Sequence, residues 1–294
     1  MKIRSFANAE VTSNFNTTIS KKLTIIILFI LNTQVFGQFN KRPNPKKRDN
    51  FIQQTEKINS LLKYYKTLSP FSDNENRFEI IDSIGNEITT RLLKVLNDKR
   101  ILNYQIEKLL TNDDLSISKS ADNKIYFFSI DEKTGGSYRT SKTIIHYRLP
   151  NGLVKAEFFG GNASEALATS TYAEIFLLDS LNQKYFVIGG VQTCNTCIAS
   201  LAITLQLDSN SINTELIAQY DGRYYDLKVF DFNFELREFN FEFYSASDDD
   251  HLYGGENEIP GFQHRFKSKF KYLNGKFVEV EKCEFWDKKI DANK

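Results

Sequence analysis

The chain has 294 residues, of which 41% are hydrophobic and 26% charged, as is typical of a folded globular protein. Its net charge of +1 provides no strongly basic surface, so we expect no nucleic-acid partner. The apolar set is strongly aromatic, with 25 phenylalanines and 14 tyrosines against one tryptophan and one methionine, and this favours sheets over helical bundles.

The N-terminus has the pattern of a secretory signal peptide. Lys21 and Lys22 precede the apolar run Leu23–Leu31, and Gly37 supplies a small residue before Gln38. The run is shorter than the ~20 residues that a bilayer-crossing helix needs. We therefore predict a signal peptide over residues 1–37 and no transmembrane span after its cleavage; the alternative is an uncleaved signal anchor. The expected location is the periplasm, the outer membrane surface or the medium.

Residues 38–50 follow as a basic linker. Five basic residues and two prolines with few apolar side chains are typical of a disordered segment. Removal of residues 1–37 takes away four basic residues and one acidic residue, which changes the net charge from +1 to −2. The processed chain is therefore close to neutral.

Residues 51–115 have helical periodicity. Apolar residues from Ile58 to Leu68 recur at helical spacing, and Ser69-Pro70 ends this first helix. A second helix is predicted from Arg77 to Leu96, and a short third one near Leu102–Leu110. The segment is expected to pack on itself or on a sheet. The buried face of the second helix is predicted to consist of Ile81, Ile84, Ile88, Leu92 and Val95.

Residues 116–290 have the pattern of an antiparallel β domain, which makes the fold α+β. In Lys124–Ile130 both alternating faces are apolar, so this strand is expected to be covered on both sides. A turn-rich loop joins it to a second strand, Thr143–Leu149, in which His146 is interpreted as a packed or surface residue. About ten short strands joined by short turns predict a meander folded into a sandwich or an open barrel.

Two turn signals in the second half illustrate the pattern. Asn274-Gly275 lies between two alternating segments, which is the strongest short hairpin signal. Asp221-Gly222 is predicted to separate a strand over residues 212–220 from one over residues 224–230.

The loop between the two central strands is a candidate ligand loop. Its glycine pair and basic residue suit an anion held by backbone N–H groups and a guanidinium. The preferred interpretation is a hairpin loop whose glycines solve a backbone problem, because the strand-to-helix context of phosphate motifs is missing. The candidate residues are Thr134, Gly135, Gly136, Ser137 and Arg139.

A short motif here resembles one found in exported β-rich proteins of Gram-negative bacteria. The resemblance implies a helical lead-in before a β domain, and an exported location, but it brings no activity and no catalytic residue. The motif consists of Asp122, Lys124 and Ile125, then Ser129 and Asp131, then Thr134 to Ser137.

Cys194 and Cys197 form a Cys-x-x-Cys motif, which in an exported protein suits a redox dithiol. Thioredoxin-like sites place this motif before a helix, whereas the residues after Cys197 alternate like a strand. We favour a hairpin loop in which the pair forms a small disulfide. The alternative is a bridge from one of them to Cys283.

A carboxylate cluster is the candidate calcium site in the sequence; a zinc site from two cysteines with His251 or His264 has no support from the spacing. Asp248, Asp249, Asp250 and Glu256 share one loop, and Ca²⁺ takes about 6–8 oxygen ligands. The spacing does not match an EF-hand, and the preferred interpretation is a solvated acidic loop with no cofactor.

The sequence therefore predicts an exported module that binds a saccharide, a peptide or an envelope protein without catalysis. The aromatic-rich sheet without a recognisable catalytic set motivates this hypothesis. The alternatives are a thiol–disulfide redox enzyme that uses Cys194 and Cys197, and a structural component of the cell envelope. A concave aromatic cleft would favour the binding module, and a long exposed strand edge would favour the structural component.

Overall fold

The computed structural model describes residues 50–110, 114–161, 165–192, 197–223, 230–244 and 262–288. Contacts within the chain divide it into two compact units, Met1–Asn50 and Phe51–Lys294. The helices and strands that follow belong to the second unit, apart from the first residue of the first helix.

The helical segment contains two long helices, α2 (Asn50–Thr67) and α3 (Arg77–Leu96), with the bounds of α3 as predicted. The predicted third helix is a 3-10 turn, η1 (Lys99–Asn103), and a short helix, α4 (Ile106–Leu109). Ile81, Ile88, Leu92 and Val95 of α3 are buried as predicted, and Ile84 is half-buried. Among the described residues, no helix has both the length and the hydropathy that crossing a membrane requires.

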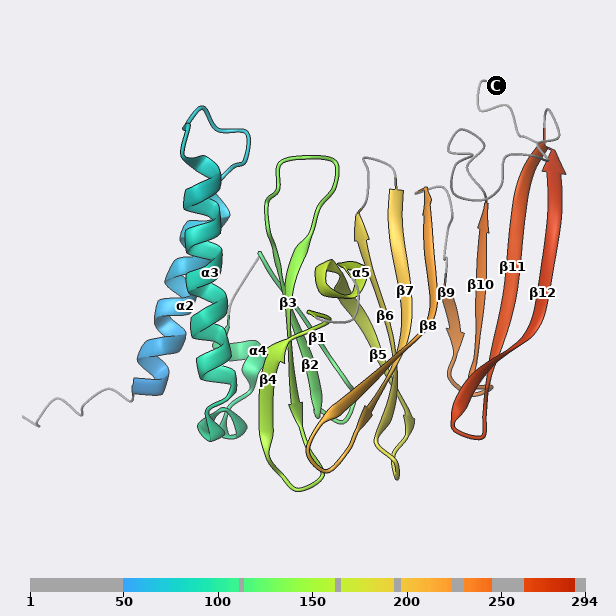
Figure 1. The fold of residues 1–294 in the computed structure, drawn as a ribbon. Helices are drawn as coiled ribbons and strands as arrows, with labels where there is room; N and C mark the ends of the chain where they lie inside the picture. The colour runs from blue at the N-terminus through green and yellow to red at the C-terminus, as the bar shows by residue number, and fades with distance from the viewer. Residues whose placement is uncertain are drawn as a thin grey trace, which may run out of the picture. The chain divides into compact units, whose positions relative to one another are not determined.

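The strands form three four-stranded antiparallel meanders (Figure 1). Sheet A contains β1 (Leu115–Lys119), β2 (Ile125–Asp131), β3 (Ser141–Arg148) and β4 (Val154–Phe158). Sheet B contains β5 (Thr171–Asp179), β6 (Lys184–Gln192), β7 (Cys197–Leu207) and β8 (Ile212–Arg223), preceded by the short helix α5 (Glu165–Thr169). Sheet C contains β9 (Phe230–Asn233), β10 (Glu238–Tyr244), β11 (Phe262–Leu273) and β12 (Lys276–Lys288).

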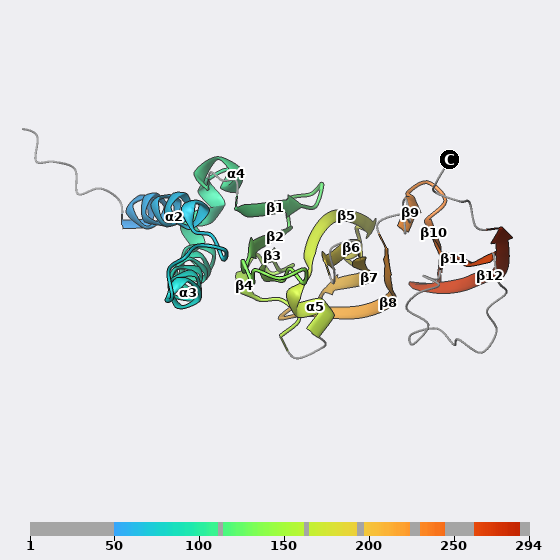
Figure 2. The ribbon, with the colours of Figure 1, turned by 90° about the horizontal axis from the view of Figure 1, so that it is seen from above.

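Three hydrophobic clusters connect these elements into layers that follow one another in chain order (Figure 2). The first joins α2 and α3 to one face of sheet A, where Tyr126 and Phe128 point. The second joins the opposite face of sheet A, with Phe127 and Ile145, to sheet B. The third joins the far face of sheet B to sheet C through Phe186 and Phe239. Sheet A is therefore covered on both faces, as the two apolar faces of β2 predicted.

The α+β class is confirmed, with helices first and antiparallel meanders after them. Two details differ from the sequence prediction. β1 was not predicted, so the first strand begins at Leu115, inside the segment expected to be helical. The turn predicted at Asp221-Gly222 is wrong, because both residues continue β8 and lie opposite Ala199 and Ile198 of β7. The pairing with β7 outweighs the local turn preference.

Candidate functional site

A pocket of about 370 Å³ lies between the last part of the helical segment and sheet A. We call it the His146 pocket. Its walls come from η1 and the α4 region on one side and from β1, β2 and β3 on the other. The lining residues are Ile101, Leu102, Tyr104, Gln105, Ile106, Glu107, Lys119, Asn123, Tyr126, His146 and Arg148.

Strand alternation places His146 on this side of sheet A. Ile144 shares its face and packs in the cluster with α2 and α3, whereas Ile145 and Tyr147 point to sheet B. In the register of the sheet His146 lies opposite Tyr126 of β2 and Ala156 of β4. The rings of Tyr126 and His146 are 6.0 Å apart and tilted by 55°.

The imidazole of His146 is buried and held neutral. Its exposed fraction is 3%, and burial lowers its pKa to about 4, opposed in part by a hydrogen bond with the backbone of Leu96. Since that bond occupies one ring nitrogen, the other nitrogen, Nδ1, is a hydrogen-bond acceptor in the neutral ring. Nδ1 is buried and has no partner in the described part of the chain. A buried, unsatisfied acceptor on a side chain that lines the pocket favours a ligand that brings an N–H or O–H donor, which reaches Nδ1 once the lining side chains move aside.

Charged and amide groups surround the pocket. Lys119 and Glu107 form an ion pair, whose hydrogen bond lowers the pKa of Glu107 and raises that of Lys119. Arg148 is exposed at the end of β3. The Tyr126 hydroxyl donates to Asn123 Oδ1 at 3.4 Å, and burial raises the pKa of that tyrosine. The pocket thus combines apolar and aromatic side chains with a few polar groups, and its volume lies in the range of small-molecule sites.

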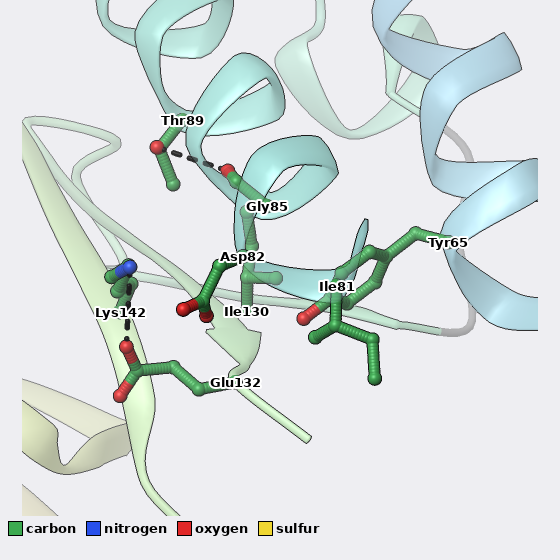
Figure 3. Close-up of a pocket in the computed structure, with 8 residues that line it drawn as sticks. All are labelled: Tyr65, Ile81, Asp82, Gly85, Thr89, Ile130, Glu132 and Lys142. Carbon is green, nitrogen blue, oxygen red and sulfur yellow. Dashed lines mark hydrogen bonds and ion pairs between the residues drawn. The ribbon is translucent and has the colours of Figure 1, made fainter. Parts of the chain in front are cut away.

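A second cavity lies between α2, α3 and sheet A, and it is far smaller. Its volume is about 10 Å³, roughly the space of one water molecule. Figure 3 shows Tyr65, Asp82 and Glu132 around it, with Lys142 paired to Glu132 at 3.3 Å. This cavity has no room for an organic ligand. A third pocket, of about 310 Å³, lies beside β3, β4 and β8, but none of its described lining residues carries a buried polar side-chain atom without a partner, so the His146 pocket is the better candidate.

The predicted ligand loop is held by local contacts. The Thr134 hydroxyl donates to the Tyr138 carbonyl at 2.6 Å, and the Arg139 N–H donates to the Gln192 carbonyl at 2.8 Å. Gly135 has a φ of +80° and lies so near Pro70 that a Cβ atom would stand 2.9 Å from the proline ring. These contacts give a structural reason for Thr134, Gly135 and Arg139, and Gly136 and Ser137 lie in the same loop. A ligand at the loop stays a prediction.

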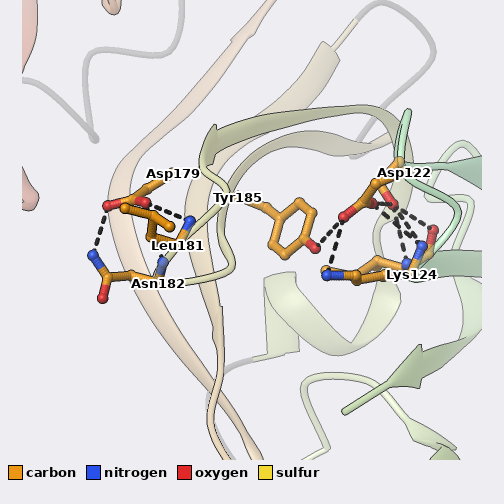
Figure 4. A network of polar contacts seen from close by, with 8 residues as sticks. Asp122, Lys124, Asp179, Leu181, Asn182 and Tyr185 are labelled. Atoms are coloured by element: carbon orange, nitrogen blue, oxygen red, sulfur yellow. Dashed lines mark hydrogen bonds and ion pairs between the residues drawn. The ribbon is translucent and has the colours of Figure 1, made fainter. Parts of the chain in front are cut away.

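The residues of the Asp122–Ser137 motif have structural partners. Asp122 accepts from the Ser120 hydroxyl at 2.7 Å and from the Tyr185 hydroxyl of β6 at 2.8 Å, and Lys124 Nζ lies 3.9 Å from it (Figure 4). This aspartate therefore connects the β1–β2 turn of sheet A to sheet B.

The second half of the motif makes comparable connections. The Ser129 hydroxyl lies 2.8 Å from that of Thr143. The Asp131 carbonyl accepts from the Tyr65 hydroxyl at 2.8 Å. The motif residues therefore join sheet A to its neighbours on both sides.

Cys197 and Cys283 belong to β7 and β12, and neither strand lines the His146 pocket. Cys197 opens β7, so a strand follows the Cys-x-x-Cys motif, as predicted for a hairpin loop, in place of the helix of thioredoxin-like sites. Cys194 and the side chain of Cys197 lie outside the described residues. Cys283 in β12 is a free thiol, 3.7 Å from Glu281 Oε1, so the predicted alternative bridge to Cys283 is not formed in the structure.

The predicted calcium ligands Asp248, Asp249, Asp250 and Glu256 lie outside the described residues. Within the described ranges, no group of three or more His, Cys, Asp and Glu side chains is arranged to hold a metal ion.

Sequence reasoning did not identify the His146 pocket. The available signal was a histidine at an inward position of the strand, between Ile144 and Arg148 on the same face. That signal does not show which other segment lies beside it, because η1 and α4 are about forty residues away in the chain.

Comparison with known proteins adds no relative, because no protein-family model, curated protein or solved structure matches the chain.

Proposed function

We propose that the protein is an exported, non-catalytic binding module that holds a small polar ligand in the His146 pocket. The single observation that carries this proposal is the buried, neutral His146 in the wall of a pocket of about 370 Å³, with no partner for its Nδ1 atom among the described residues. Leaving such an acceptor unsatisfied costs roughly 1–3 kcal/mol, which a ligand donor would recover.

The lining favours a saccharide as the ligand. Tyr104 and Tyr126 line the pocket with aromatic side chains that suit the apolar side of a sugar, and Gln105 and Asn123 both donate and accept hydrogen bonds. His146 Nδ1 accepts from a hydroxyl. Arg148 adds a positive charge suited to a carboxylate on an acidic sugar. A short peptide is the competing ligand for the same groups.

Ligand-observed NMR on the purified chain with panels of neutral and acidic oligosaccharides and short peptides tests the proposal. Leu102→Trp fills the mouth of the pocket, since Leu102 lines it and is 48% exposed. Leu153→Trp is the matched control, because Leu153 is 44% exposed and does not line the pocket. We expect a saccharide ligand whose affinity falls on the order of tenfold or more in the first variant only.

Two results would overturn the proposal. One is a panel in which no saccharide binds. The other is a saccharide that binds the two tryptophan variants equally well, which would place its site elsewhere. A peptide ligand lost only in Leu102→Trp would keep the pocket and replace the ligand class.

Export is tested separately. Expression in a Gram-negative host followed by intact-mass measurement of the periplasmic fraction should give a chain that begins at Gln38. A chain that keeps residues 1–37 and sediments with membranes would support the signal anchor instead.

A further inference from the structure

The end of sheet C carries a long edge strand. β12 runs from Lys276 to Lys288 and is first in the order β12-β11-β10-β9, so β11 is its only strand partner within the described residues. Val278, Val280 and Phe285 on this strand are 46%, 49% and 37% exposed. An edge of this kind is a template for pairing with another strand.

Charge and shape restrict what this edge can pair with. Glu279, Glu281 and Glu284 are exposed, which opposes pairing with an acidic strand. The register of β11 and β12 shifts between Lys269 and Phe270, and the extra residue on the β12 side is Val280. A bulge of this kind twists a strand, so Val280 divides the edge into two regular parts, residues 276–279 and the longer residues 281–288, and we consider the longer part.

We propose that the occupant of this edge is a second copy of the chain, paired antiparallel through β12 about a two-fold axis at Cys283. In this register Lys282 of each copy lies opposite Glu284 of the other, so two ion pairs flank the axis. Glu281 lies opposite Phe285, which leaves no like-charged pair from Glu281 to Phe285. Self-complementarity of the same patch on both copies is what a two-fold interface requires.

Cys283 provides a cross-linking test of the proposed dimer geometry. Its thiol is half-buried and shares a face of the strand with Glu281. Residues directly opposite in an antiparallel pair have Cα atoms about 4.5–5.5 Å apart, which is within the range of a disulfide. The two Cys283 thiols are therefore placed for cross-linking by an added thiol oxidant, which removes two electrons and two protons as the S–S bond forms.

Charge reversal tests the proposal with its own control. We expect light scattering after size exclusion to give a dimer for the full chain. Lys282→Glu and Glu284→Lys each place like charges on both sides of the axis and should weaken the dimer on the order of tenfold or more. The double variant restores opposite charges and should restore the dimer. Both side chains are exposed, and circular dichroism checks that each variant folds.

Cross-linking tests the register. In a Cys194→Ser/Cys197→Ser background, diamide should join two chains through Cys283, and the yield should fall in each single charge variant and recover in the double one. A monomeric chain at all accessible concentrations overturns the proposal. A dimer that the single charge variants leave intact also overturns it and assigns the interface to another surface, such as the edge strand β8.

Discussion

Sheet A and sheet C have the same antiparallel topology but very different surroundings. The six residues Ile125–Ile130 of β2 are all buried, because helices cover one face of sheet A and sheet B covers the other. In sheet C one face packs on sheet B through Phe239 and Phe270. The alternating residues on the opposite face carry charges. There Glu238 of β10 forms ion pairs with Lys269 and Lys271 of β11.

Because of this difference in burial, polar side chains need hydrogen-bond partners within the protein in sheet A, whereas those on the outer face of sheet C can reach water. In sheet A the buried Ser129 and Thr143 hydroxyls bond to each other, and Thr143 also reaches the Ser170 carbonyl at 2.7 Å. Across β1 to β4, as far as they are described, His146 Nδ1 is the one buried side-chain nitrogen or oxygen atom without a partner. An unsatisfied group is therefore informative in sheet A, whereas the charges on the outer face of sheet C are paired, with Glu238, 8% exposed, held between two lysines that reach water.

The largest contrast is expected from removing one aromatic ring from each sheet. Phe127 of sheet A is fully buried, with ring centroids 4.6 Å from Tyr172 and 5.1 Å from Phe159. Phe127→Ala should lower the free energy of unfolding by about 3–5 kcal/mol. Phe277→Ala in β12 should cost less, because Phe277 is only half-buried. Urea denaturation measures both; equal losses would contradict the difference in burial between the two sheets.

His146 should make stability depend on pH. Its folded pKa of about 4 lies below the ordinary value of 6.5, so the unfolded chain binds the proton first. Stability is therefore full above about pH 6.5 and falls as the pH drops toward 4, by about 3 kcal/mol from this group.

The measurement is urea denaturation between pH 7 and 4 on the wild type and on His146→Leu. The leucine variant also loses the Leu96 hydrogen bond, so the informative quantity is the slope with pH and not the absolute stability. The neighbouring titratable groups Glu107, Lys119 and Arg148 remain in both proteins. An unchanged slope in the variant would show that His146 is not the buried neutral group described above.

The link between sheets A and B should have an intermediate effect. The Tyr185 hydroxyl donates to the carboxylate of Asp122, whereas the Tyr172 hydroxyl donates to the neutral Leu167 carbonyl, both at 2.8 Å. Tyr185→Phe should cost about 2 kcal/mol and Tyr172→Phe about 1 kcal/mol, because a hydrogen bond to a charged acceptor is stronger. Thermal unfolding of the two variants gives the comparison. A larger loss in Tyr172→Phe would show that Asp122 does not stabilise the contact between the sheets.

Local periodicity explains what the sequence predicted well. The spacing of Ile81, Ile88 and Leu92 defines α3, and the two apolar faces of β2 define a strand covered on both sides. β1 was missed because Leu115–Lys119 is short and only its pairing with β2 makes it a strand. Asp221 and Gly222 have local turn chemistry that the ladder with β7 overrides.

The candidate site was harder to predict from the sequence than the fold. The His146 pocket forms where residues near Leu102 meet residues near His146, and no spacing in the chain encodes that meeting. A desolvated imidazole also differs from a surface one only through its three-dimensional neighbours. In contrast, the members of the Asp122–Ser137 motif are close together in the sequence, although their role in joining layers required the structure.

The smallest effect is expected on the outer face of sheet C. Glu238 lies 2.9 Å from Lys269 and from Lys271, and their hydrogen bonds lower its pKa, with Lys269 as the larger cause. Its contribution to stability is present above the ordinary carboxyl pKa and is lost as the pH falls through the lowered one. Glu238→Gln should shift the melting temperature less than Tyr172→Phe does, and about 0.5 M salt should remove most of the shift, because both lysine side chains reach water.

Glu279→Gln, at an exposed glutamate of β12, is the control. A salt-resistant loss in Glu238→Gln larger than that of Tyr185→Phe would mean that the outer face of sheet C is covered as sheet A is, and the contrast between the two sheets would fail.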